Sequence, residues 1–95
     1  MIFSVGIKRG AFKDVQNIRR QAPAEERPRI DLTFEYLVRV ELREDGHLKG
    51  EAYPGDPSFR KTARGPLEAV YRVRPLDDRY LEVAHFRRVE ARPQT

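Results

Sequence analysis

Hydrophobic and polar residues alternate along positions 30–42, whose sequence is IDLTFEYLVRVEL. The apolar set is Ile30, Leu32, Phe34, Tyr36, Val38, Val40 and Leu42, and the residues between them are polar except for Leu37. Side chains alternate between the two faces of a β-strand, so this period of two predicts a strand over 30–43 with one buried face. A strand with one polar face is typical of an antiparallel sheet, because parallel strands are usually buried on both faces.

Two further elements are predicted before this strand. Apolar residues at the odd positions of 2–7 indicate a first strand, in which Gly6 suggests a bulge or a close backbone approach. Apolar residues then recur every three positions, which predicts one face of a helix over about 11–21. Pro23 ends this helix, and 22–29 is a polar connection.

A first hairpin is predicted between 30–43 and 47–53. A two-residue loop would place charged residues on the apolar face of the pair. A three-residue loop at 44–46 instead pairs Leu42 with Leu48 and brings opposite charges together on the wet face. We therefore predict the three-residue loop, with its glycine in the left-handed position of a type I turn with a bulge.

A second hairpin is predicted between 67–75 and 80–86, joined by LDDR. One strand register gives suitable side-chain pairs on both faces of the hairpin. On one face it pairs Val73 with Leu81, Tyr71 with Val83 and Ala69 with His85, and on the other it pairs Arg72 with Glu82 and Val70 with Ala84. The two aspartates of the connection are ordinary turn residues.

The order of elements is β-α-β-β-β-β, which predicts a single α+β domain over residues 1–95 with flexible ends at about 91–95. We expect a curved antiparallel sheet of four or five strands, with one helix packed on its apolar face. The strand over 30–43 exceeds the common length of ~5–6 residues, so it must curl, bulge or extend past its neighbours.

Charge is abundant and unevenly distributed. Charged residues make up 36% of the chain, and the 19 basic residues include 15 arginines. Residues 30–56 carry a net charge of −4, whereas 1–29 carry +4 and 57–66 carry +3. Such asymmetry can bind an anion or a second copy of the chain. A GC-rich genome would also enrich arginine, and heat-adapted proteins carry many surface charges. These two explanations carry more weight than a functional one.

Several classes of function have no support in the sequence. The chain has no cysteine, so it has no disulfide, thiolate metal site or cysteine nucleophile. It shows no signal peptide and no apolar run long enough to cross a membrane, and we expect a cytoplasmic protein. No phosphate-binding loop, dinucleotide fingerprint or metal-ligand spacing is present. We therefore expect no cofactor, no metal and no catalytic activity.

Residues 54–66, PGDPSFRKTARGP, are the one segment that resembles a binding site. Its prolines and glycines predict a loop, and its basic residues come with no acid after Asp56. Basic groups with an interleaved aromatic suit RNA or single-stranded DNA, since they offer a backbone track and a stacking platform. The candidate residues are Phe59, Arg60, Lys61 and Arg64, supported by Lys13 and Arg20 on the predicted helix. A solvated loop anchored by its phenylalanine is the commoner explanation of such a segment.

The remaining candidates are two histidines and an apolar patch. The predicted register turns His85 toward the apolar face as a core histidine, and His47 lies near a turn on the surface. Leu37 on the wet face, with Val70, Ala84 and Phe86, could form the contact of a homodimer. The sequence thus supports a nucleic-acid- or phosphate-binding accessory protein, or alternatively a homo-oligomeric interaction module with no nucleic-acid role.

Overall fold

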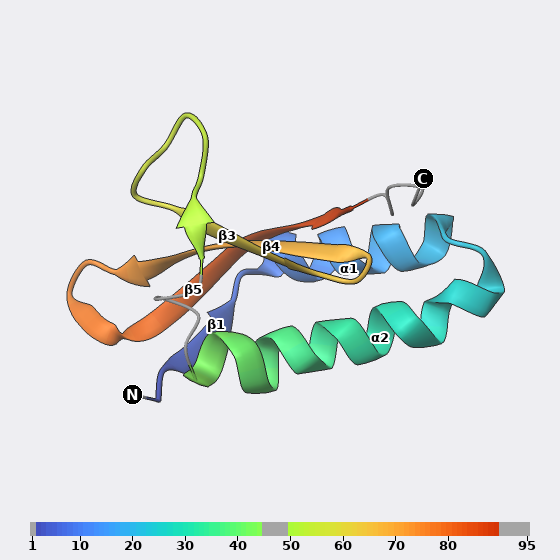
Figure 1. Ribbon diagram of the computed structural model, residues 1–95, viewed down its shortest axis with the longest axis horizontal. Coiled ribbons are helices and arrows are strands. Elements are labelled where there is room, and N and C mark those ends of the chain that lie inside the picture. The colour runs from blue at the N-terminus through green and yellow to red at the C-terminus, as the bar shows by residue number, and fades with distance from the viewer. Residues whose placement is uncertain (1, 45–49, 90–95) are drawn as a thin grey trace, which may run out of the picture.

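The computed structural model describes residues 2–44 and 50–89, so the predicted 44–46 turn and the flexible end at 91–95 lie partly or wholly outside the described residues. The chain folds into a five-stranded sheet with two long helices (Figure 1). Its elements are β1 (Ser4–Ile7), α1 (Arg9–Gln21), the 3-10 turn η1 (Ala24–Glu26), α2 (Arg27–Tyr36), the π-helical turn η2 (Leu37–Glu41), β2 (Glu51–Ala52), β3 (Arg60–Arg64), β4 (Leu67–Arg74) and β5 (Asp77–Arg88). The prediction of an α+β fold is confirmed.

The sheet is mixed rather than antiparallel. Its strand order is β1-β5-β4-β3-β2, and β1 runs parallel to β5 while the other neighbours are antiparallel. The prediction of an antiparallel-only sheet is therefore wrong. The pattern of apolar residues reports which face of a strand is buried and carries no information about the direction of its neighbour.

The predicted first helix is confirmed as α1, which begins two residues earlier than expected. Ala11, Val15 and Ile18 face the core. Figure 1 shows α1 and α2 running side by side, joined at one end, and an ion pair of 3.1 Å between Arg19 and Asp31 links them. Both helices contribute to one core with alternate residues of the strands, so both pack on the same face of the sheet.

The residues predicted as the strand 30–43 are helical, so that prediction is wrong. Ile30 and Leu37 are fully buried, whereas Leu32 is 68% exposed. The period-two pattern also contains a helical stripe, because positions 30, 34, 37 and 38 lie on one side of a helix. Leu37, the exception to the strand pattern, is a central residue of this stripe. The dimer contact predicted at Leu37 is wrong for the same reason, since both Leu37 and Phe86 lie in the core.

The π-helical turn η2 keeps a further leucine in the core. The N–H of Leu42 donates to the C=O of Leu37, five residues earlier, where an α-helix would bond four residues apart. In a regular helix, positions five apart lie roughly 140° apart around the axis. The wider turn brings Leu42 back to the side of Leu37, and both are fully buried.

With 30–43 helical, the first predicted hairpin does not form. The second hairpin is confirmed in part: β4 and β5 pair Tyr71 with Val83, Arg72 with Glu82 and Val73 with Leu81. Beyond Tyr71 the register shifts, so that Val70 opposes His85 and Ala69 opposes Phe86. Ala84 is the extra residue of this β-bulge, and a bulge turns the side chains beyond it to the opposite face. The predicted Val70–Ala84 and Ala69–His85 pairs are therefore wrong.

Gly6 allows a close approach, as predicted, although it is the ring of Tyr80 that lies over it. A Cβ at this position would overlap the end of that ring. None of the described helices is long and apolar enough to cross a membrane.

Candidate functional site

The face of the sheet opposite the two helices carries charged and aromatic residues. On β4, Leu67, Ala69 and Tyr71 lie in the core and Val73 packs against it. Glu68 and Arg72, which alternate with these residues, therefore point to the other side. We call this side the open face. It contains most of the paired charges that the strands contribute.

Glu82 lies at the centre of one group of charges on the open face. Its carboxylate is 3.4 Å from the amine of Lys8, 3.2 Å from Nη2 of Arg72 and 3.8 Å from Nε of Arg74. The Glu82 side chain is only 13% exposed. One carboxylate thus positions three cations, and the group keeps an excess of positive charge.

Aromatic rings lie beneath three arginines of the open face. The guanidinium carbon of Arg74 is 4.6 Å from the ring centroid of Tyr80. That of Arg72 is 5.4 Å from the centroid of Phe59, and that of Arg87 is 5.4 Å from the centroid of Tyr53. Arg87 also donates from Nη2 to the Tyr53 hydroxyl at 2.6 Å. Stacking holds each guanidinium in place while leaving donors available to an anion.

A shallow pocket of about 210 Å³ lies at the other end of the open face. Its lining residues are Tyr53, Pro54, Lys61, Glu68 and Arg87. Lys61 and Glu68 form a weak ion pair of 3.9 Å, so Arg87 adds a positive charge that no carboxylate of the described residues contacts. Among the described residues, no three His, Asp or Glu side chains gather as metal ligands.

His85 is exposed at the margin of this face, because of the β-bulge, and the prediction of a core histidine is wrong. Its Nδ1 lies 3.4 Å from Oδ2 of Asp14, and the same oxygen accepts the N–H of Phe86 at 3.2 Å. Asp14 thereby fixes the orientation of an imidazole that is open to solvent. His47 lies outside the described residues.

The structure separates the residues that the sequence grouped in the 54–66 segment. Positions 60–64 form strand β3, so only the first part is a loop. Phe59 and Lys61 lie on the open face. Arg60 and Arg64 point to the helix side, where Arg60 donates to the C=O of Gly50 at 2.7 Å and Arg64 contacts Glu41 at 3.2 Å.

Other predicted contributors lie away from the open face. Lys13 and Arg20 are exposed on α1, which packs on the opposite face, so they cannot extend a track that includes Lys61. In the loop that precedes β3, Ser58 donates its hydroxyl to Asp56 at 2.6 Å. That bond, with one from the Ser58 N–H and the charge of Arg72, lowers the pKa of the Asp56 carboxyl.

Sequence reasoning missed the arginines that the structure brings together. Arg72, Arg74 and Arg87 belong to the second hairpin, and the predicted register already placed Arg72 opposite Glu82 on the polar face. The alternation of arginine along 72–74 was the available signal. Alternation alone does not distinguish a binding surface from ordinary exposed residues, because arginine is mostly exposed in folded proteins.

No protein-family model matches the sequence, and no curated protein is detectably similar to it. Solved structures do share the fold. The toxin–antitoxin complex RelBE2 of Mycobacterium tuberculosis contains a chain that matches with a TM-score of 0.71 and 12% identity, covering 94% of this chain and 100% of that one. The chromosomal ParDE toxin–antitoxin system of Pseudomonas aeruginosa gives 0.70 and 19%, covering 94% and 98%.

A mutant of the Escherichia coli toxin RelE in its free state gives a TM-score of 0.57 and 18% identity, covering 90% of this chain and 82% of that one. These likenesses extend over nearly the whole chain, so they concern the complete fold rather than one motif. The protein therefore has the fold seen in these toxin–antitoxin proteins.

Proposed function

We propose that this protein is the toxin component of a toxin–antitoxin pair and that a protein partner holds it inactive. The observation that carries the proposal is the match of almost the whole chain to chains of two toxin–antitoxin systems, at TM-scores of 0.71 and 0.70. This replaces the accessory role that the sequence suggested. In the proposal the open face acts on the cellular target.

Growth under controlled expression tests the proposal. We expect induction in a bacterial host to arrest growth, and replacement of Arg72 and Arg74 by alanine to restore it. Replacement of Lys13 and Arg20 by alanine is the matched control, because it removes the same charge from α1 on the opposite side of the molecule. Immunoblots would establish equal soluble amounts of each variant. Normal growth with abundant soluble wild-type protein would refute the toxin proposal.

A second candidate function is binding of single-stranded RNA or DNA by the open face. The observation that favours it is the set of three arginines stacked on aromatic rings. Stacked bases and neutralised phosphates are the two contributions that single-strand binding requires. The sequence-derived interface, which included Arg60 and Arg64, is replaced here by one that excludes them.

Fluorescence anisotropy with a labelled single-stranded RNA tests this candidate. Affinity should fall steeply as salt rises, because each phosphate contact releases counterions. Arg87→Ala with Arg74→Ala should weaken binding at least tenfold, whereas Lys13→Ala with Arg20→Ala, which removes the same charge from α1, should leave it unchanged. Equal losses in both variants would mean nonspecific attraction to a basic protein. The absence of catalytic activity and the formation of a homodimer stay predictions.

A further inference from the structure

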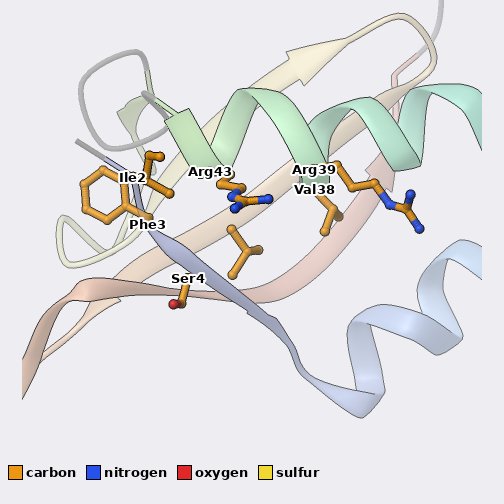
Figure 2. A pocket seen from close by; sticks show the side chains of 7 residues that line it. Ile2, Phe3, Ser4, Val38, Arg39 and Arg43 are labelled. Atoms are coloured by element: carbon orange, nitrogen blue, oxygen red, sulfur yellow. The ribbon is translucent and has the colours of Figure 1, made fainter.

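The free edge of β1 borders a groove that no part of the proposed toxic activity uses. β1 is an edge strand, since the order of the sheet places only β5 beside it. Ile2, Phe3, Ser4 and Val5 line one side of the groove, and Val38, Arg39 and Arg43 line the other (Figure 2). Its volume is about 390 Å³.

The backbone of β1 faces this groove in an alternating way. The N–H of Lys8 donates to the C=O of Val83, which means that even-numbered residues bond to β5. The N–H and C=O groups of Val5 and Ile7 therefore point away from β5. Val5 lines the groove, and at its end the N–H of Phe3 donates to the C=O of Arg43 at 2.7 Å. Among the described residues, no backbone hydrogen bond joins the groups of Val5 and Ile7 to another segment. Unpaired groups along a strand edge form a template for an additional strand.

The side chains around the edge define what such a strand should carry. Val5 and Val38 provide an apolar floor, and Ile2 is 66% exposed at one end. Arg39 is 76% exposed with only a distant Glu35, 3.9 Å away, and Arg43 contacts no carboxylate among the described residues. The groove thus combines apolar surface with two available positive charges.

We propose that this groove binds an extended segment of a partner protein, which adds a strand beside β1 and carries alternating apolar and acidic side chains. Addition of a strand to a sheet edge is a common mode of peptide recognition, in which the backbone gives affinity and side chains give specificity. This inference rests on the proposed function in that the partner would be the antitoxin.

A second copy of the chain is a poorer occupant. Its own edge strand is SVGI, which contains no acidic residue and is followed by Lys8 and Arg9. Pairing two such strands would bring the arginines of both copies together, and like charges in proximity oppose association. The charges therefore favour a different, acidic partner.

Nuclear magnetic resonance with two synthetic peptides tests the inference. One peptide alternates valine with glutamate, the other alternates valine with lysine, and both are acetylated and amidated. The glutamate peptide should slow hydrogen exchange of the Val5 and Ile7 amides at least tenfold and leave Gly6 and Lys8 unchanged. The lysine peptide should have no effect. Shifts confined to the open face, or equal binding of both peptides, would overturn the proposal.

Two double charge reversals provide the matched variants. Arg39→Glu with Arg43→Glu should weaken binding of the glutamate peptide at least tenfold, whereas Lys13→Glu with Arg20→Glu should not. Protection of Val5 and Ile7 in the peptide-free protein, together with a doubled mass in light scattering, would show that a second copy fills the groove and would refute the proposal.

The binding measurement does not depend on toxicity. Growth arrest without peptide binding would exclude this groove and leave the toxin proposal standing. Peptide binding without growth arrest would support this groove as a binding site and refute the toxin proposal.

Discussion

Replacing Glu82 by glutamine should lower stability and raise affinity for anions. The carboxylate contacts Lys8, Arg72 and Arg74 at 3.2–3.8 Å, and each of these cations is a third to a half exposed. Exposed ion pairs contribute about 0.2–1 kcal/mol each. Three of them sharing one largely buried carboxylate give a loss of roughly 1–2 kcal/mol in the free energy of unfolding. For a domain of this size that corresponds to a fall in Tm of about 4–16 °C.

Glu68→Gln is the matched control for this substitution. Glu68 lies on the same face and is similarly buried, but it contacts a single cation, Lys61, at 3.9 Å. We expect a loss below about 0.5 kcal/mol, close to the lower range of exposed pairs. Thermal unfolding followed by circular dichroism measures both variants, and the difference between them should shrink at 1 M salt, where screening is strong.

The same substitution should act in the opposite direction on binding. It leaves three cations without their shared carboxylate, so affinity for single-stranded RNA should rise several-fold at low salt. Equal Tm values for the Glu82 and Glu68 variants would refute the reasoning that one carboxylate organises the group. Weaker RNA binding by a folded Glu82→Gln protein would refute the assignment of the cluster to anion binding.

Three further predictions concern the fold. In urea unfolding, Leu37→Ala should lower the free energy of unfolding by about 2–5 kcal/mol and Leu32→Ala by less than about 0.5 kcal/mol. If 30–43 were a strand, Leu32→Ala would cause the larger loss. Burial raises the pKa of Tyr71 to about 12, so its contribution to stability is complete below pH 10 and is lost as pH rises from about 10 toward 12. Tyr71→Phe should abolish that part of the alkaline loss, measured by unfolding at pH 9 and 11.5. Gly6→Ala should displace the Tyr80 ring, visible as a change in its aromatic resonances; an unchanged ring would contradict the close approach.

Predictions of secondary structure and strand register were correct where the apolar residues fitted only one periodicity. The helix α1 and the β4–β5 pairing around Arg72 and Glu82 were correct, because only one register placed apolar residues together and matched charges. The bulge at Ala84 was not predictable, since an alanine is compatible with either face. One extra residue there reversed the orientation of His85.

The error over 30–43 has a different origin. The segment contains valines, an isoleucine and a threonine, which favour strands, and its apolar residues fit both a period of two and a helical stripe. Packing against the sheet decides between the two, through Ile30, Leu37 and Leu42. The residues of the predicted site do not share one face for a related reason: Arg60, Lys61 and Arg64 are close in sequence, and a strand directs successive side chains to opposite faces.

The pairing of β1 with β5 determines when the protein can fold during synthesis. β5 lies between β1 and β4 and also contacts α1, so the core contains residues from both ends of the chain. Contacts between distant segments require the closure of long loops, and this closure slows folding. The first helix emerges from the ribosome long before the strand that covers it, and the sheet is complete only after β5 has been released. A nascent chain therefore exposes its apolar surface until β5 has been released, and a partner that binds the edge of β1 could act only after β5 has paired with it.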